Sequence, residues 1–239
     1  MTRIDEIAPD IFRISTYVDD IKLQFNQFLV KDEEPLLFET GMKQIFPLVR
    51  EAVAKVLDPS TIRHISFSHY EPDECGSLNE WLAVAPRAEA ACSIVGAMVF
   101  VNDGATRPAR ALQPDEVFKT GKHRFRFKST PQLPHGWDAG VLFEETTGTL
   151  FCSDLFGHGG DPAPSTTSDV VGAFREMTKF MQQSPMANYM PYTRNTDGQI
   201  RELAALKPRI CATMHGSTFV GQGEKALLDL GAAMKELLG

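Results

Sequence analysis

Histidines and carboxylates follow short apolar runs at three places that lie far apart in this chain. These places are 69–74, 134–154 and 214–216 of a sequence of 239 residues. Sheet proteins position their site residues on loops that follow the ends of strands. The chain must therefore fold so that several strand ends converge, and this requirement constrains its architecture more than any other feature of the sequence.

The first half of the chain is predicted to place strands before helices. Apolar runs within 11–38 predict strands, and 32–35 predicts the turn of a hairpin. Apolar residues recur at helical spacing over 43–57, which predicts a helix there. Ser77 is expected to cap a second helix that ends before Pro86.

The second half repeats this order. Residues 88–152 predict short strands and turns, and the pair at 147–148 predicts a hairpin. Helices are expected over 168–183, 198–206 and 223–238. Because sheet layers covered by helices give this order, the predicted fold class is α/β, or α+β.

Composition argues against two classes of partner. The chain has 24 Lys and Arg against 31 Asp and Glu, a net charge of -7, and no basic run. Proteins that bind nucleic acids or anionic membrane surfaces carry basic patches. The longest apolar run, 90–101, is shorter than the roughly 20 residues that span a bilayer. Neither nucleic acid nor membrane is therefore expected as a partner.

The sequence also predicts a single cytoplasmic domain. Its first residues, MTRIDEIAPD, are polar and acidic, unlike a secretory signal. The four cysteines are scattered without a CxxC pair, which indicates reduced thiols. No repeat, low-complexity tract or linker marks a boundary, so residues 1–239 are expected to form one domain.

The clustered histidines and carboxylates predict a metal centre. His69 and Glu71 are two residues apart, so extended backbone directs both to one side. Pro72 fixes the backbone that follows, and the next two carboxylates can turn back on the same pocket from a helix start. Together these groups provide enough ligands for two metal ions. The candidate ligands are His69, Glu71, Asp73, Glu74, His135, Asp154 and His215.

The run His69-Tyr70-Glu71-Pro72-Asp73-Glu74 resembles the HxHxDH motif of the metallo-β-lactamase fold, a four-layer αββα sandwich. The upstream segment 38–41, Phe-Glu-Thr-Gly, resembles the early strand-turn signature of that fold. More narrowly, His-x-Glu-x-Asp resembles flavodiiron proteins and stand-alone oxygen-binding diiron proteins. Glu71 stands where zinc hydrolases of the fold have a second histidine. The resemblance covers essentially the whole chain.

This resemblance implies two iron ions that share one bridging carboxylate. The family motif ends in a histidine where this chain has Glu74. Either Glu74 coordinates through oxygen, or that ligand position is vacated. The implied ligand sets are His69, Glu71, His135 and Asp154 for one iron, and Asp73, Asp154 and His215 for the other.

The donor chemistry favours iron or manganese over zinc. Oxygen-rich mixed sites suit the first two metals, whereas zinc prefers nitrogen and sulfur. The general affinity order of divalent metals nevertheless favours zinc over iron. Zinc and manganese therefore stay open as alternative occupants.

The resemblance implies a protein that binds or reduces dioxygen, or another small diatomic such as nitric oxide. Flavodiiron proteins carry a flavodoxin domain with FMN, but no phosphate loop for FMN is visible here. No FMN is therefore expected in this chain, and electrons or signals would pass to or from a separate partner. The protein would act as a sensor or as a partner-dependent oxidoreductase, with no catalytic residue beyond the metal ligands. A homodimer is compatible with this function.

Two other functions stay open. A dinuclear-metal hydrolase would activate water to attack an ester, thioester or phosphodiester, with Asp73 orienting the water. Glu71 in place of a histidine argues against it. A metal-free relic that serves as an interaction domain is the third reading, and the near-complete ligand set argues against it.

Three neighbours of the candidate ligands carry their own predictions. Tyr70 alternates away from the ligands on either side, so it is expected in the core. Trp137 is expected beside the pocket. His158 is expected to be an exposed loop residue.

Overall fold

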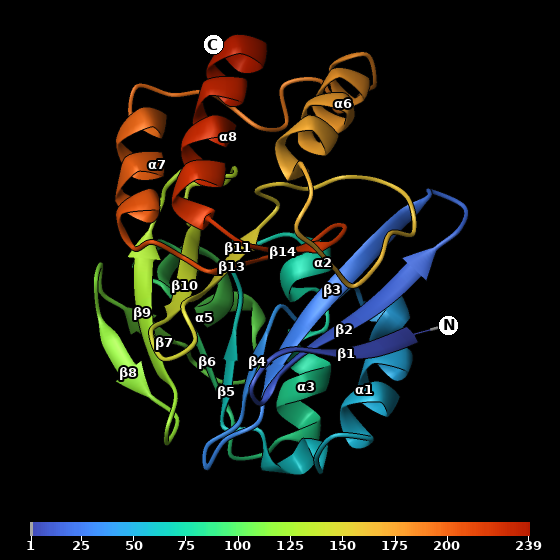
Figure 1. Cartoon of the computed structure of the whole chain (residues 1–239). Helices are drawn as coiled ribbons and strands as arrows, with labels where there is room; N and C mark the ends of the chain where they lie inside the picture. Colours follow the sequence, from blue (N-terminus) through green and yellow to red (C-terminus); the bar gives the residue numbers. More distant parts are fainter. Residues whose placement is uncertain (1) are drawn as a thin grey trace.

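The computed structural model describes residues 2–239 as two seven-stranded sheets with helices on both outer faces (Figure 1). The first sheet is built in sequence order, from β1 at one edge to β7 at the other. Its strands are β1 (Thr2–Ala8), β2 (Ile11–Val18), β3 (Leu23–Val30), β4 (Leu36–Phe38), β5 (His64–Ser66), β6 (Glu89–Ser93) and β7 (Arg110–Leu112).

The second sheet uses the later part of the chain, in the order β12-β14-β13-β11-β10-β9-β8. Strand β11 pairs in parallel with β13, so the carboxyl ends of these two strands lie side by side. Its strands are β8 (Val117–Lys119), β9 (Arg124–Ser129), β10 (Gly140–Glu144), β11 (Thr149–Ser153), β12 (Ser165–Thr166), β13 (Ile210–Thr213) and β14 (Thr218–Val220).

The helices fall into two groups, one on each side of the paired sheets, as Figure 1 shows for α1 and α3 against α6, α7 and α8. The helices are α1 (Phe46–Ala54), α2 (Pro72–Cys75), α3 (Leu78–Val84), α4 (Ile94–Gly96), α5 (Asn102–Gly104), α6 (Val170–Gln182), α7 (Thr196–Ala205) and α8 (Gly223–Leu238). Shorter turns are the 3₁₀ turns η1 (Lys43–Ile45) and η2 (Pro59–Thr61), and the π-helical turn η3 (Ala97–Val101).

Three hydrophobic cores separate the layers. The middle core joins the two sheets, with Phe38 from the first sheet packed against Phe151 of the second at 5.3 Å between ring centres. One outer core lies between the first sheet and α1 and α3. The other lies between the second sheet and α6, α7 and α8. This order of layers is the αββα sandwich that the family resemblance implies.

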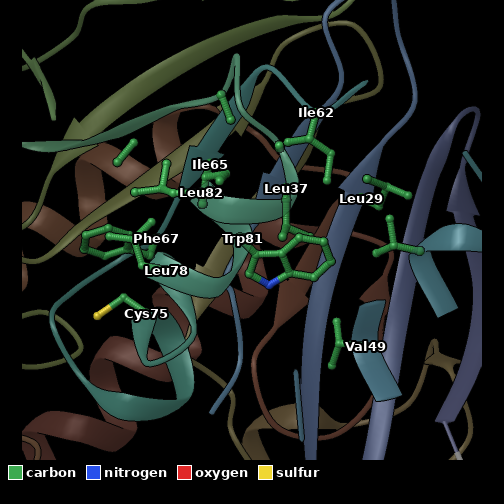
Figure 2. Close-up of a cluster of buried hydrophobic side chains, with 14 of the residues drawn as sticks. Leu29, Leu37, Val49, Ile62, Ile65, Phe67, Cys75, Leu78, Trp81 and Leu82 are labelled. Atoms are coloured by element: carbon green, nitrogen blue, oxygen red, sulfur yellow. The ribbon is translucent and has the colours of Figure 1, made fainter. Parts of the chain in front are cut away.

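Trp81 of α3 anchors the outer core of the first sheet. Figure 2 shows its indole among the apolar side chains of Leu37, Val49 and Leu82. The indole N–H donates to the carbonyl oxygen of Thr40 at 3.1 Å, so the buried ring leaves no polar atom unpaired. This hydrogen bond ties α3 to the segment that follows β4.

Most predicted elements are confirmed, with ends that match or differ by a few residues. The helix predicted over 43–57 is η1 followed by α1, and it ends at Ala54. The hairpins β3–β4 and β10–β11 are both present. Among the described residues 2–239, no helix has both the length and the apolar character needed to cross a membrane.

Two local predictions are wrong. Residues 94–104 are helical rather than strand and turn, because Ser93 caps the segment by accepting a hydrogen bond from the Gly96 N–H at 3.0 Å. Ser77 precedes α3 but does not cap it with its side chain. Its hydroxyl instead donates to the carbonyl oxygens of Thr40 and Gly41, at 2.8 and 3.0 Å.

Candidate metal centre

Four strands and the loops that follow them bring the predicted site residues together. His69 and Glu71 follow β5, and α2 begins directly afterwards with the next two carboxylates. Asp154 follows β11 and His215 lies two residues past β13, so the parallel pairing of these strands places both side chains at one edge. His135 comes from the loop between β9 and β10. Both sheets therefore contribute to one cluster.

The first group of donor atoms combines two imidazoles and two carboxylates. His69 Nε2 lies 3.1 Å from Glu71 Oε2, and His135 Nε2 lies 3.0 Å from Asp154 Oδ2. His135 Nε2 is also 3.3 Å from Glu71 Oε2. One donor atom from each of these four residues lies within 4.8 Å of the others, a spacing at which a single metal ion can contact all four.

The second group is richer in oxygen. His215 Nε2 lies 3.3 Å from Asp73 Oδ2 and 3.3 Å from Asp154 Oδ1. Carboxylate oxygens of Glu71, Asp73 and Glu74 lie within 4.8 Å of one another. Asp154 thus presents one oxygen to each group, which is the arrangement of a carboxylate that can bridge two ions.

The cluster holds more negative charge than its histidines offset. Burial alone would raise the pKa of Asp154, but the imidazoles of His135 and His215 hold that pKa well below its ordinary value. Burial raises the pKa of Glu74 well above its ordinary value, and the charges of Asp154 and Asp73 raise it further. Both carboxylate oxygens of Glu74 are buried without a hydrogen-bond partner. Buried unpaired carboxylates are costly, and a bound cation would compensate them, so these residues fit metal ions.

Neighbouring groups fix the orientation of the imidazoles. His215 Nδ1 donates to the carbonyl oxygen of Gln24 at 2.8 Å, which leaves Nε2 free to face the cluster. His69 Nδ1 lies 3.0 Å from the hydroxyl oxygen of Ser68, whose own proton goes to Ser153 Oγ at 2.7 Å. Ser68 therefore accepts from Nδ1, and the Nε2 lone pair of His69 is also directed to the cluster.

Glu39 is a buried carboxylate beside the centre that the sequence did not single out. It follows β4 with a φ of 61°, a left-handed conformation that is uncommon outside glycine. Burial raises the pKa of its carboxyl well above the ordinary value. A hydrogen bond from Ser68 lowers this pKa, and the nearby charge of Asp154 raises it further. A charged residue directly after a fully apolar strand was the available signal, because such a side chain can be buried only where other polar groups gather.

A cavity of about 410 Å³ opens onto the cluster. Its inner wall includes five of the predicted ligands, all except His69 and Glu74, while its outer wall is mainly apolar. Tyr189 lies in this wall, with its ring 5.4 Å from that of His135. The apolar part of the lining is Ile21, Leu23, Phe25, Met42, Pro72, Met177, Phe180, Met181 and Met186.

The three neighbours of the ligands lie elsewhere than predicted. Tyr70 is 46% exposed and stacks on Phe100 at 4.5 Å, so it is not a core residue. Trp137 is 65% exposed and does not line the cavity. His158 is half-buried rather than exposed, and its Nε2 accepts a hydrogen bond from the Ser217 N–H at 3.2 Å. Short-range alternation could not predict these positions, because each depends on a contact with a distant segment.

Comparisons with known proteins find matches over most of this chain. Residues 23–216 match the family model described as ODP family beta lactamase. A diflavin flavoprotein A 1 of Nostoc sp. is 31% identical over 199 residues, which cover 80% of this chain and 33% of that protein. A flavo-diiron protein of Clostridium acetobutylicum is 24% identical over 202 residues, covering 83% of this chain and 50% of that protein. The chain thus spans a third to a half of the length of these relatives.

Solved structures share the fold at lower sequence identity. A flavoprotein from Thermotoga maritima superposes with a TM-score of 0.80 at 23% identity, over 96% of this chain and 61% of that one. The rubredoxin oxygen:oxidoreductase from Desulfovibrio gigas superposes with a TM-score of 0.82 at 22% identity, over 96% of this chain and 61% of that one. These likenesses support the αββα architecture.

Proposed function

Because this chain belongs to the family described as ODP family beta lactamase, we propose that it is a non-haem diiron protein that binds or reduces dioxygen or nitric oxide. The observation that carries this proposal is the convergence of three histidines and four carboxylates in one cluster beside the cavity. The relatives named flavo-diiron protein and diflavin flavoprotein support it over a hydrolase.

The proposed ligands divide into two sets that share Asp154. Glu71 is the reason for preferring iron to zinc, since a carboxylate oxygen stands where zinc hydrolases of the fold have a nitrogen donor. Zinc or manganese remains a candidate for either set. The proposed sets are His69, Glu71, His135 and Asp154 for one ion, and Asp73, Glu74, Asp154 and His215 for the other.

The residues around the centre suit a small uncharged substrate. The apolar lining of the cavity admits a diatomic molecule while it disfavours water and ions. Hydrogen bonds from His215 to Gln24 and from His69 to Ser68 hold both imidazoles with Nε2 toward the centre. Ferrous iron, when bound there, supplies the electrons that dioxygen accepts.

Repeated turnover would need electrons from outside residues 2–239. Two ferrous ions provide two electrons, which reduce one dioxygen only to the level of peroxide. We therefore propose a separate electron donor for sustained reduction. One structurally similar protein supports this proposal, because its name, rubredoxin oxygen:oxidoreductase, includes both oxygen and a second protein, rubredoxin. Without a donor the protein would respond once to its ligand, as a sensor does.

Anaerobic iron loading followed by oxygen addition tests this function. The metal-free chain should take up about two ferrous ions and then consume oxygen in a fixed ratio to iron before uptake stops. An optical absorption band should appear at the same time. Retention of two zinc ions, together with turnover of a phosphodiester and no oxygen uptake, would identify a hydrolase instead.

A further inference from the structure

Methionine side chains gather around the cavity of about 410 Å³ that opens onto the candidate metal centre. Four of the nine methionines of the chain line this cavity, whereas three others are buried in the two outer cores. Met98 is 69% exposed and does not line the cavity. The methionines that line it, here called the cavity methionines, are Met42, Met177, Met181 and Met186.

Helix α6 and the turn after it carry three of the cavity methionines. Met177 and Met181 are one helical turn apart, so their side chains lie on the same face of α6. Both are half-buried, and Met186, which follows the end of α6, is 49% exposed. The proposed ligands His135 and Asp154 line the same cavity. A small molecule that leaves the centre through this cavity therefore passes these thioethers.

A thioether can react with the product that dioxygen gives at such a centre. Dioxygen takes up two electrons from two ferrous ions, and two protons from solvent, to give hydrogen peroxide. Hydrogen peroxide then oxidises the thioether to a sulfoxide: one oxygen atom bonds to the sulfur, the O–O bond breaks, and the other oxygen leaves as water. The sulfur supplies the two further electrons. One dioxygen is therefore reduced completely without an outside donor, and one methionine is oxidised.

Other sulfur groups do not compete for peroxide inside this cavity. The four cysteines of the chain are all buried, and none of them lines it. The core methionines Met190, Met214 and Met234 are at most 1% exposed, so peroxide has no access to them. The thioethers of the cavity methionines are therefore the oxidisable sulfur that a molecule in the cavity can reach.

We propose that the cavity methionines accept an oxygen atom from the peroxide that forms at the centre, with Met177 and Met181 of α6 as the main sites. This inference rests on the proposed function and goes beyond it, because it assigns a covalent modification to side chains outside the ligand sets. A sulfoxide is polar where the thioether is apolar. The reaction therefore changes the outer wall of the cavity and leaves a lasting record of one exposure to oxygen.

Isotope labelling of the full chain tests the proposal through the mass of its methionines. The chain is loaded with Fe(II) without air, and dioxygen of a heavy oxygen isotope is added once in the presence of catalase, which destroys peroxide in bulk solution. Peptide mass spectrometry should find the heavy atom on Met177 and Met181. The same chain loaded with zinc, which supplies no electrons, should stay unlabelled.

Met98 is the internal control for peroxide that has escaped into solution. Because it is more exposed than any cavity methionine, peroxide in bulk solution would oxidise it first. Met98 should therefore stay unlabelled while the α6 methionines are labelled. Absence of the label from Met177 and Met181, or equal labelling of Met98, would overturn the proposal.

A matched set of conservative substitutions measures the peroxide itself. Leucine keeps the volume and apolar character of methionine but has no sulfur, so a chain with both Met177→Leu and Met181→Leu should keep its cavity. Without catalase, this double variant should release severalfold more hydrogen peroxide into solution than the parent. Met98→Leu should release as much as the parent. Equal release from the parent and the double variant would refute the proposal.

The outcomes separate this inference from the proposed function. Oxygen uptake in a fixed ratio to iron, without a label on the α6 methionines, would refute the inference and leave the oxygen-binding function standing. An iron-loaded chain that consumes no oxygen would refute both. The labelling of the parent protein decides the question even if the double variant fails to fold.

Discussion

The carboxylate of Asp154 faces histidines on both of its sides, with Oδ2 at 3.0 Å from His135 and Oδ1 at 3.3 Å from His215. Asp154→Ala should therefore release both metals rather than one, since a single side chain serves both ligand sets. Metal content per chain after desalting measures this loss. Asp229→Ala, which removes an exposed partner of Lys225, is the control and should keep both metals. An Asp154→Ala protein with two metals at parent affinity would rule out the bridging role.

Gly216, next to His215, has a φ of 100° and no room for a side chain. An added Cβ would lie 2.3–2.5 Å from the imidazole of His158. Gly216→Ala should cost about 1–3 kcal/mol of unfolding free energy in urea, because backbone strain and the collision add. Gly160 is the control, because its φ is 89° but nothing lies within 4 Å of an added Cβ. Gly160→Ala should therefore lose only the unfolding free energy that backbone strain costs. Equal losses in both variants would argue against the collision.

At the scale of secondary structure, the β10–β11 hairpin depends on a buried carboxylate. Glu144 Oε2 accepts from the Thr147 N–H at 2.7 Å, and Oε1 accepts from the Thr146 N–H at 2.9 Å. Burial would raise the pKa of Glu144, but His123 and these turn residues lower it well below its ordinary value of 4.5. The folded state therefore prefers the ionised carboxylate.

This preference predicts how stability depends on pH. A carboxyl group whose pKa is lower in the folded chain than in the unfolded chain stabilises the folded chain at pH values above the unfolded-state pKa. That stabilisation is lost as the pH falls below the unfolded-state pKa toward the folded-state pKa. The free energy of unfolding of the parent should exceed that of Glu144→Gln by about 1–3 kcal/mol near neutral pH. This difference in unfolding free energy should shrink below about pH 4.5. Urea unfolding of both proteins across this range measures it. Because both proteins share all other carboxylates, the pH dependence that those groups cause is the same in both and drops out of the difference. A difference in unfolding free energy that grows toward acid pH would contradict the prediction.

The sequence predicted strand ends better than it predicted side-chain partners. Apolar runs bounded by turn residues define β5, β11 and β13, so the convergence of the residues that follow them could be anticipated. Residues 94–101 are mostly apolar and partly β-branched, which suits a strand, and the hydrogen bond from the Gly96 N–H to Ser93 Oγ caps a helix there instead. The surroundings of Glu39 depend on contacts across the sandwich, which no short window of sequence contains.

At the scale of the molecule, the proposed metal centre joins the two sheets, since His69 follows a strand of the first sheet and Asp154 follows one of the second. Bound metal should therefore stabilise the whole fold. Binding to the folded chain alone adds about 2.7 kcal/mol at a hundredfold excess over the dissociation constant, which corresponds to about 5–10 °C in melting temperature for a chain of this size. Calorimetry with and without a chelator measures this shift. The Asp154→Ala protein is the control and should melt at one temperature in both conditions.

The division of the ligands between the two sheets also affects the order in which the parts of the centre form. Residues 2–112 contain every strand of the first sheet and, between β5 and α3, one histidine and three carboxylates of the centre. During synthesis this half emerges from the ribosome first, carrying an acidic half-site that lacks two of its three histidines. The centre is complete only when β13 has joined β11 and delivered His215. Under the proposed ligand assignment, metal capture is therefore expected to be a late step in the maturation of this protein, and it would report that the two halves have docked.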